Sequence, residues 1–336
     1  MPRSAIKENP VSNPLEELSA ILLADMTHTN TLILQNMESR VPLIPQLAKY
    51  LIAAGGKRIR PLLTLACTKI YLGDMTRAHR LAAAVEFIHS ATLLHDDVVD
   101  ESEERRGQDT ANVVFGNQAS VLVGDFLFAR AFQLMVEDGS LDVLRTLSNA
   151  AATIAQGEVL QLAAINDLDT NMDHYIEIIS AKTAALFAAA CEVGPLVANQ
   201  GHQNAQALAD YGMNLGIAFQ IADDAMDYSS SREKMGKTVG DDFREGKMTA
   251  PVILAYAQGT AEEKEFWQRT IADNQQTPDD LKRAQDIIAT HNAIEQSLLL
   301  ADSYAAKAKE ALGNIPPGEL TDLLSATVDF SVRRQY

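Results

Sequence analysis

Apolar positions recur at helical intervals along most of the chain, whereas the strict alternation that marks a strand is scarce. The segment 141–162, "LDVLRTLSNAAATIAQGEVLQL", shows this spacing clearly. Its apolar positions at helical intervals are Leu141, Leu144, Ala151, Ile154, Ala155, Val159 and Leu162. The chain has no proline from Leu62 to Gly194, and long proline-free stretches rich in Ala and Leu favour helix. The pattern therefore predicts an all-α protein.

Helical spacing and turn-forming residues together divide the chain into about a dozen predicted helices. The best defined cover roughly 15–36, 61–72, 77–102, 119–137, 141–164, 172–198, 204–230 and 279–312. The 336 residues could form one large domain or two average ones, but no break resembles an interdomain linker and no repeat is evident. We expect one helical domain over residues 15–336, preceded by a flexible N-terminus of residues 1–14.

The formal charge of −17 at pH 7 restricts the partners of this chain. Nucleic-acid-binding domains carry a basic stripe, and anionic membrane surfaces attract basic segments, so neither partner is expected. An anionic small ligand would need basic residues that are gathered locally.

Cysteine usage and the length of apolar runs bear on location. Cys67 and Cys191 stand in apolar stretches, which predicts buried free thiols in a reducing compartment. The N-terminal stretch has no apolar core of signal-peptide length. No run reaches the roughly 18 to 20 apolar residues that a spanning helix needs. We therefore expect a cytoplasmic protein without a transmembrane segment.

Two acidic clusters of the form DDxxD end predicted apolar helices. They are Asp96, Asp97 and Asp100 in "LLHDDVVDESEERRG", and Asp223, Asp224 and Asp227 in "AFQIADDAMDY". Carboxylates at a helix C-terminus oppose the helix dipole, which favours cations there. One such cluster is at least as well explained by a solvated surface, but two indicate carboxylates gathered around metal ions. Oxygen ligands without Cys or paired His indicate Mg²⁺ or Mn²⁺ rather than zinc.

Basic residues accompany the acidic clusters. "GGKRIRP" places Lys57, Arg58 and Arg60 after a glycine turn, and "ERRG" contributes Arg105 and Arg106. Arginine forks and lysine point charges suit phosphate oxygens. In a strongly acidic chain, this combination predicts a polyphosphate substrate.

These motifs resemble those of the trans-prenyltransferases, the head-to-tail isoprenyl diphosphate synthases, over essentially the whole chain from about residue 15. The shared motifs, in family order, are "GGKRIRP", "LLHDDVVDESEERRG", "GDFLFARAF", Lys182–Thr183, "AFQIADDAMDY" and "GKTVGDDFREGK". The variety is similar to long-chain octaprenyl, solanesyl and decaprenyl diphosphate synthases. The resemblance implies a helical bundle around a deep central cleft, and a homodimer. Met248 departs from the pattern, because the family often has Pro at this position.

The resemblance also implies the reaction. An allylic diphosphate, such as farnesyl diphosphate, ionises with Mg²⁺ on its leaving group, and Mn²⁺ is a possible substitute. Isopentenyl diphosphate attacks the carbocation, and proton loss restores an alkene. Repeated condensation would give a long chain that supplies a quinone side chain. No side-chain nucleophile is needed, which agrees with the lack of a persuasive Ser/His or Cys/His arrangement.

The family match also implies roles for individual residues. The metal ligands would be Asp96, Asp97, Asp100, Asp223, Asp224 and Asp227. Residues at the allylic diphosphate would be Arg105, Lys182, Lys237 and Lys247. Residues at isopentenyl diphosphate would be Lys57, Arg60, His89 and Arg106. Thr183 and Gln220 have neutral dipoles that could lie along the developing cation. Arg58 is expected to be a structural or surface charge, and His95 to pack between helices.

Product length is expected to depend on the helix that carries the first cluster. In the family, bulky residues four or five positions before that cluster close the product tunnel early. Here those positions hold Thr92 and Ala91, both small, with Ile88 a turn earlier. Phe132 and Met135 are expected to set the tunnel floor, which predicts an octaprenyl to decaprenyl product.

Three alternatives remain at the level of sequence. A terpene cyclase or head-to-head condensing enzyme shares acidic clusters but lacks the GGKRxR segment. A silent regulatory subunit of a heteromeric prenyltransferase usually lacks one cluster, and both are intact here. A di-iron bundle would need Glu with Glu-x-x-His ligands, and no such pair is evident.

Overall fold

The structure, a computed structural model, describes residues 13–333 apart from 54–55, 106 and 230–238. The helices are α1 (Pro14–Ile21), α2 (Leu23–Asn36), α3 (Leu43–Ala53), α4 (Ile59–Ile70), α5 (Met75–Val99), α6 (Ala111–Phe115), α7 (Asn117–Asp138), α8 (Leu141–Ala164), α9 (Met172–Ile179), the π-helix η1 (Ser180–Ala184), α10 (Ala185–Val197), α11 (His202–Asp227), α13 (Asp241–Arg244), α14 (Ala250–Gln258), α15 (Ala261–Trp267), the π-helix η2 (Gln268–Ala272), α16 (Asp280–Thr290), α17 (Ala293–Ala311), the 3₁₀ turn η3 (Leu312–Asn314) and α18 (Glu319–Val332). A two-residue hairpin, β1 (Glu104–Arg105) and β2 (Gln108–Asp109), follows α5. The predicted all-α class is confirmed.

Local capping explains where several of these helices begin. The side chain of Asp74 accepts the first free N–H groups of α5, from Thr76 and Arg77. Ser140 does the same for α8, and Asn171 for α9. These polar residues satisfy donors that a helix leaves unpaired at its N-terminus. The caps therefore agree with the apolar pattern in setting the start of each helix.

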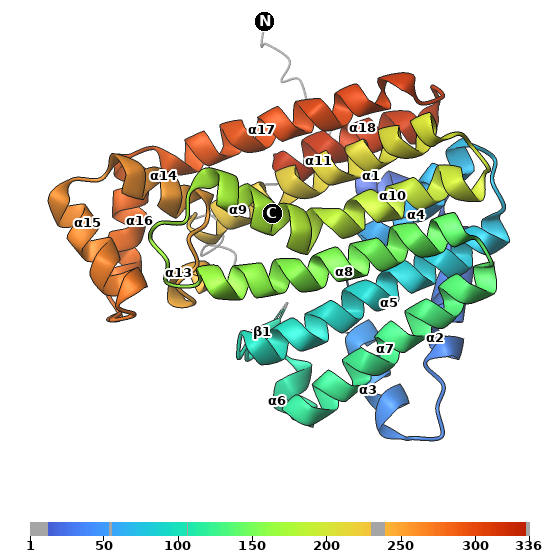
Figure 1. The fold of residues 1–336 in the computed structure, drawn as a ribbon, viewed down its shortest axis with the longest axis horizontal. Coiled ribbons are helices and arrows are strands. Elements are labelled where there is room, and N and C mark those ends of the chain that lie inside the picture. Colours follow the sequence, from blue (N-terminus) through green and yellow to red (C-terminus); the bar gives the residue numbers. More distant parts are fainter. Residues whose placement is uncertain (1–12, 54–55, 106, 230–238, 334–336) are drawn as a thin grey trace, which may run out of the picture.

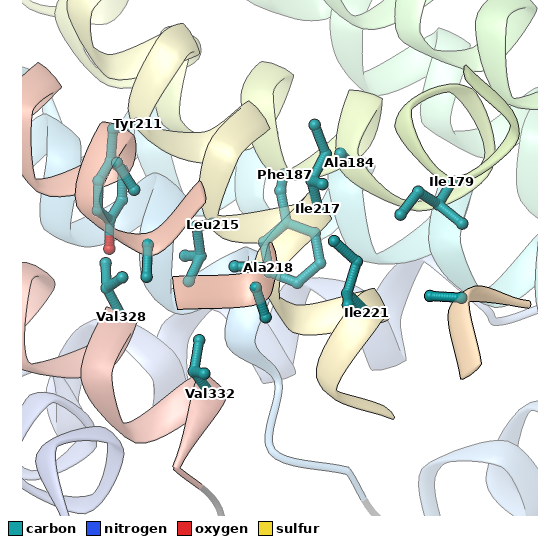
Figure 2. Close-up of a cluster of buried hydrophobic side chains, with 14 of the residues drawn as sticks. Ile179, Ala184, Phe187, Tyr211, Leu215, Ile217, Ala218, Ile221, Val328 and Val332 are labelled. Atoms are coloured by element: carbon teal, nitrogen blue, oxygen red, sulfur yellow. The ribbon is translucent and has the colours of Figure 1, made fainter. Parts of the chain in front are cut away.

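The long helices pack side by side around α10. Figure 1 shows α17, α11, α10, α8, α5 and α7 in roughly parallel arrangement, with α14–α16 gathered at one end. α10 contacts α4, α8 and α11, and α5 packs along α7. The approach of α11 to α10 is close, since a Cβ at Gly212 would lie 2.4 Å from the Phe187 carbonyl oxygen. Buried aliphatic and aromatic side chains fill this contact, including Phe187, Ala218 and Ile221 (Figure 2).

Several expected boundaries change in the structure. The predicted helix 15–36 is divided into α1 and α2, and the predicted helix 172–198 is interrupted by η1. The apolar stripe of α8 covers two faces: Ile154 is buried, whereas Val159 and Leu162 are 68% and 57% exposed. Residues 1–12 of the expected N-terminal extension lie outside the described residues, and Pro14 already belongs to α1.

One helix of the described chain, α7, is long and apolar enough to cross a membrane by length and composition, with a mean hydropathy of 1.5. The expectation that no such segment exists is therefore wrong. Asp125 and Arg130 interrupt its apolar run, but two charged residues do not lower its mean hydropathy enough to exclude it. Buried residues make up 39% of the apolar window, and α7 packs along α5. A core helix of a globular protein has the same composition.

Candidate active site

The first acidic cluster lies at the C-terminal end of α5, where each aspartate faces a basic side chain. Asp97 is 3% exposed and accepts from both Nη2 and Nε of Arg105, at 2.7 and 2.8 Å. The β1–β2 hairpin presents this arginine. Asp96 Oδ2 lies 3.7 Å from Lys182 Nζ, and Asp100 Oδ2 lies 3.4 Å from Lys247 Nζ. These partners compensate the repulsion that three adjacent carboxylates would otherwise have.

Burial also acts on this cluster. It raises the pKa of the Asp96 carboxyl, Lys182 opposes that rise, and the charge of Asp100 adds to it. Burial lowers the pKa of Lys247, but the carboxylates of Asp100 and Glu245 outweigh this and hold the pKa above its usual value. The lysine is therefore a permanent positive charge beside the first cluster.

The second acidic cluster lies at the end of α11 and is held by neutral donors. The Tyr175 hydroxyl donates to Asp224 Oδ2 at 2.6 Å, and Gln220 Nε2 donates to Oδ1 at 2.7 Å. Thr183 Oγ1 donates to Gln220 Oε1 at 2.9 Å, which fixes the orientation of that amide. Burial raises the pKa of Asp224 to about 7, although both hydrogen bonds favour the charged form. Asp223 is half-buried on the same helix.

The segment after α11 brings further charges to this end of the molecule. The backbone N–H of Asp242 donates to Asp227 Oδ2 at 3.1 Å. Burial, together with Asp224 and Asp227, raises the pKa of Asp242 well above its usual range. Met248 is 5% exposed, and the adjacent Lys247 reaches Asp100. Met248, at the position where the family often has Pro, therefore does not prevent Lys247 from reaching Asp100.

The π-helix η1 presents Lys182 and Thr183 to the same space. Lys182 Nζ lies 2.7 Å from Glu158 Oε2 of α8. Burial raises the pKa of Glu158 to about 7, with Lys182 opposing the rise and Asp96 adding to it. Sequence reasoning missed Glu158 and Tyr175. Glu158 is a charged residue on the predicted apolar face of α8, and this feature of the sequence could have marked it as functional. No local feature of the sequence marks Tyr175.

One cavity connects these groups. Its lining residues are Gln161, Ala164, Ile165, Thr170, Tyr175, Ile178, Ile179, Lys182, Thr183, Gln220, Asp224, Asp242, Lys247, Met248 and Thr249. The two lysines that face the first acidic cluster therefore line the same cavity as Asp224 of the second cluster. A cavity with two ammonium groups and buried carboxylates suits a polyphosphate carried with divalent cations.

A second basic group lies between α4 and α5. Arg60 Nη1 is 3.3 Å from His89 Nε2, and the guanidinium lies over the Phe187 ring at 4.3 Å. Burial lowers the pKa of Arg60 to about 10, so this arginine stays charged at neutral pH. Lys57 Nζ lies 5.3 Å from the centre of the Phe330 ring of α18. The structure thus places Lys57, Arg60 and His89 around the N-terminal part of α4.

Other predicted residues have simpler surroundings. Arg58 forms an ion pair with Glu86 at 3.0 Å, in agreement with a structural charge. His95 packs against Gly124 of α7, as expected for a packing residue. Arg106 and Lys237 lie outside the described residues.

The residues expected to control chain length differ in burial. Ile88, Ala91 and Met135 have no exposed surface. Thr92 Oγ1 donates to the carbonyl of His89 at 2.8 Å. Phe132 is 40% exposed on α7, so it does not close an enclosed tunnel within a single chain.

The oxygen donors of these carboxylates are of the type that a hard divalent cation prefers. Within the described part of the chain, no group of three or more His, Cys, Asp or Glu side chains is arranged to hold a metal ion. Instead Lys182 and Lys247 lie beside the aspartates of the first cluster. Mg²⁺ needs only one or two carboxylates when substrate phosphates and water complete its octahedron. Asp96 and Asp100 could supply such ligands from one face of α5.

Comparison with known proteins agrees with this fold. Residues 41–288 match the model of the polyprenyl synthetase family. The chain is 42% identical to the octaprenyl diphosphate synthase of Escherichia coli (strain K12), over 95% of this chain and 99% of that protein. It is 37% identical to an all-trans-nonaprenyl-diphosphate synthase (geranyl-diphosphate specific) of Rhodobacter capsulatus, over 90% and 92% of the two chains.

Solved structures of polyprenyl synthases are also similar to this chain. A decaprenyl diphosphate synthase from Rhodobacter capsulatus superposes with a TM-score of 0.91 at 47% identity, covering 95% of this chain and 98% of that one. A polyprenyl synthase from Caulobacter crescentus CB15, complexed with calcium and isoprenyl diphosphate, gives 0.93 at 50% identity, covering 98% and 100%. The chain belongs to the polyprenyl synthetase family and is a prenyltransferase. Within that family it is a long-chain trans-polyprenyl diphosphate synthase.

Proposed function

We propose that the protein extends an allylic diphosphate, farnesyl diphosphate or a similar primer, by successive head-to-tail addition of isopentenyl diphosphate. The product would be an octaprenyl to decaprenyl diphosphate that supplies a quinone side chain. The observation that carries this proposal is the shared cavity: Lys182 and Lys247, which face the first acidic cluster, also line the cavity of Asp224.

The allylic diphosphate would lie between the two clusters. Mg²⁺, or Mn²⁺ in its place, would neutralise the charge on the departing diphosphate. Asp96, Asp100 and Asp223 would hold it, while Lys182 and Lys247 bind the phosphate oxygens. Arg105 already uses two of its N–H groups on Asp97, so it would both orient that aspartate and reach the phosphate with its remaining donors.

The carbocation that follows ionisation would lie beside oriented neutral dipoles. Thr183 and Gln220 are held by a hydrogen bond between their side chains, and Gln220 is held further by Asp224. Dipoles that are fixed before the reaction need no reorganisation as charge develops. Apolar neighbours such as Ile178 and Ile179 would exclude water, which would otherwise capture the cation.

Isopentenyl diphosphate would occupy the second basic group, at Lys57, Arg60 and His89. We predict that Lys57→Ala raises the KM for isopentenyl diphosphate about tenfold and changes the KM for the primer much less, because a lost phosphate partner weakens the substrate it holds. Steady-state kinetics with each substrate varied in turn measures this. Arg58→Ala is the matched control, since Arg58 pairs with Glu86. An equal rise for both substrates would mean that the basic residues are divided wrongly.

Product length tests the proposed chain-length specificity. Purified protein with farnesyl diphosphate, labelled isopentenyl diphosphate and Mg²⁺ should give chains of eight to ten prenyl units, separated by chromatography after dephosphorylation. Ala91→Phe should shift the product sharply towards short chains and preserve the first condensation, because a ring at this fully buried position fills space that the growing chain needs. Ala91→Ser should keep the long product. Wild-type product that stops at farnesyl or geranylgeranyl diphosphate contradicts the proposal.

We further propose a cytoplasmic homodimer that pairs through α7 and α8. Leu122 and Val136 of α7 are 67% and 65% exposed, and Val159 of α8 is 68% exposed. Exposed apolar side chains on adjacent helices favour a protein partner. A second copy would also cover Phe132, which could then contribute to the tunnel floor.

A further inference from the structure

Glu158 has no place in the reaction as described above, yet it lies inside the site. Its Oε2 is 2.7 Å from Lys182 Nζ, its Oε1 is buried, and its side chain also forms a hydrogen bond with Asp96 that lowers the pKa of that aspartate. An acidic side chain at the C-terminal part of a predicted apolar helix face needs an explanation beyond solubility.

Backbone packing builds this contact. Gly157, the preceding residue of α8, lies so close to η1 that an added Cβ would be 2.6 Å from the Lys182 backbone nitrogen. The π-helical turn presents the lysine at this point of closest approach. The Glu158–Lys182 pair is therefore fixed by the contact between two helices rather than by two flexible surface side chains.

Lys182 has a second carboxylate within reach. Its Nζ lies 3.7 Å from Asp96 Oδ2, one ångström farther than from Glu158. A lysine in direct contact with Asp96 would occupy the position of a divalent cation on that oxygen. The Lys182 ammonium group and a metal ion would therefore compete for Asp96. The strength of this competition depends on how firmly Glu158, the other partner of the lysine, holds it.

We propose that Glu158 is a positioning residue that holds Lys182 away from Asp96. It thereby keeps the aspartate available to the metal ion and directs the ammonium into the cavity where the diphosphate binds. This inference rests on the proposed roles of Asp96 and Lys182. It predicts that removing Glu158 weakens metal binding only while Lys182 is present.

Direct metal binding tests this without turnover. We would titrate Mn²⁺ into wild type, Glu158→Ala, Lys182→Ala and the double variant, each with inorganic pyrophosphate, and follow free Mn²⁺ by electron paramagnetic resonance. Glu158→Ala should bind Mn²⁺ about tenfold more weakly, which corresponds to about 1.4 kcal/mol. In the Lys182→Ala background the same change should have no effect, so the double variant matches Lys182→Ala.

The other outcomes separate the alternatives. Equal weakening in both backgrounds would show that Glu158 binds the metal itself or only supports packing, and would overturn the proposal. No weakening in either background would also overturn it. Failure of wild type to bind Mn²⁺ would instead count against the proposed metal site. Circular dichroism checks the fold of every variant.

Two further variants keep the test decisive if Glu158→Ala fails to fold. Glu158→Gln retains an acceptor for Lys182 without the charge, so its Mn²⁺ affinity should lie between those of wild type and Glu158→Ala. Glu192 of α10 is also partly buried but does not line the cavity, and Glu192→Gln should bind Mn²⁺ like wild type. Weakening by Glu192→Gln equal to that by Glu158→Gln would contradict a specific role.

Discussion

The acidic clusters at the ends of α5 and α11 share one sequence spacing but hold their buried aspartates differently. Asp97 of the first cluster is 3% exposed and lies against the guanidinium of Arg105. Asp224 of the second is 5% exposed and accepts from the uncharged side chains of Tyr175 and Gln220. One carboxylate is compensated by a positive charge, and the other, within the described part of the chain, by hydrogen bonds from neutral donors.

This difference has an energetic consequence. Burial penalises the charged form of any carboxylate, and a cationic partner offsets that penalty more strongly than neutral donors do. Accordingly, burial raises the pKa of Asp224 to about 7. Asp224 should therefore be sensitive to pH near neutrality, whereas the surroundings of Asp97 should respond chiefly to changes in Arg105.

Removal of the metal should have the largest effect, because both clusters act through it in the proposed reaction. EDTA should abolish turnover, and excess Mg²⁺ or Mn²⁺ should restore it, since the departing diphosphate needs neutralising. Asp96→Ala and Asp223→Ala should each lower kcat at least about a hundredfold, with an unchanged circular dichroism spectrum. Full turnover in chelator would refute the metal-assisted reaction. A large loss at only one of the two aspartates would show that the clusters are not equivalent in catalysis.

A smaller effect is expected at Tyr175, and it sharpens the contrast in pH response. In the reaction proposed above, ionised Asp224 holds Gln220 beside the carbocation, so kcat/KM should fall as the pH falls through about 7. The Tyr175 hydroxyl favours the ionised form, and Tyr175→Phe should move this acidic limb upward by about one pH unit. Kinetics from pH 5.5 to 9 measures the shift.

Tyr211→Phe is the matched control for this prediction. Tyr211 is also fully buried, but its hydroxyl donates to the Leu324 carbonyl, 2.9 Å away, rather than to a carboxylate. Its removal should leave the pH profile in place. Identical profiles for Tyr175→Phe and wild type would mean that Asp224 does not govern the acidic limb.

The two clusters also differ in how much of their surroundings the sequence could predict. The apolar pattern was sufficient to predict α7 and α8, and the ends of both helices match the predicted ranges closely. The DDxxD spacing predicts that the two sets of aspartates form one kind of site, and Asp224 lines the same cavity as the lysines that face the first set. The Arg105 partner of Asp97 is only eight residues away in the chain, although the sequence analysis placed this arginine at the allylic diphosphate rather than against the aspartate.

The partners of the second cluster could not be predicted in the same way. Tyr175 is 49 residues before Asp224, and its contact depends on how α9 packs against α11. Glu158 reaches Lys182 only because Gly157 lets α8 approach a π-helix that regular helical periodicity does not predict. Burial and long-range packing, rather than residue type, determine these contacts.

The smallest effect concerns stability, where the two buried aspartates should respond in opposite directions. Between its unfolded pKa of 3.8 and its folded pKa of about 7, Asp224 holds a proton that the unfolded chain has released. The free energy of unfolding therefore decreases as the pH rises through this window. In metal-free protein at pH 8, Asp224→Asn should raise that free energy by about 1–3 kcal/mol, and at pH 4 it should change it little.

Asp97→Asn should instead lower the free energy of unfolding, because it removes the charge that compensates Arg105. The arginine side chain is 39% exposed, which limits the loss to about 1 kcal/mol. Urea unfolding of both variants at pH 4 and pH 8, without divalent cations, measures the two changes. Opposite signs at pH 8 would establish that the carboxylate held by neutral donors opposes folding while the ion-paired one supports it. Destabilisation by both substitutions at pH 8 would contradict that contrast and would mean that the hydrogen bonds from Tyr175 and Gln220 outweigh the burial of the Asp224 charge.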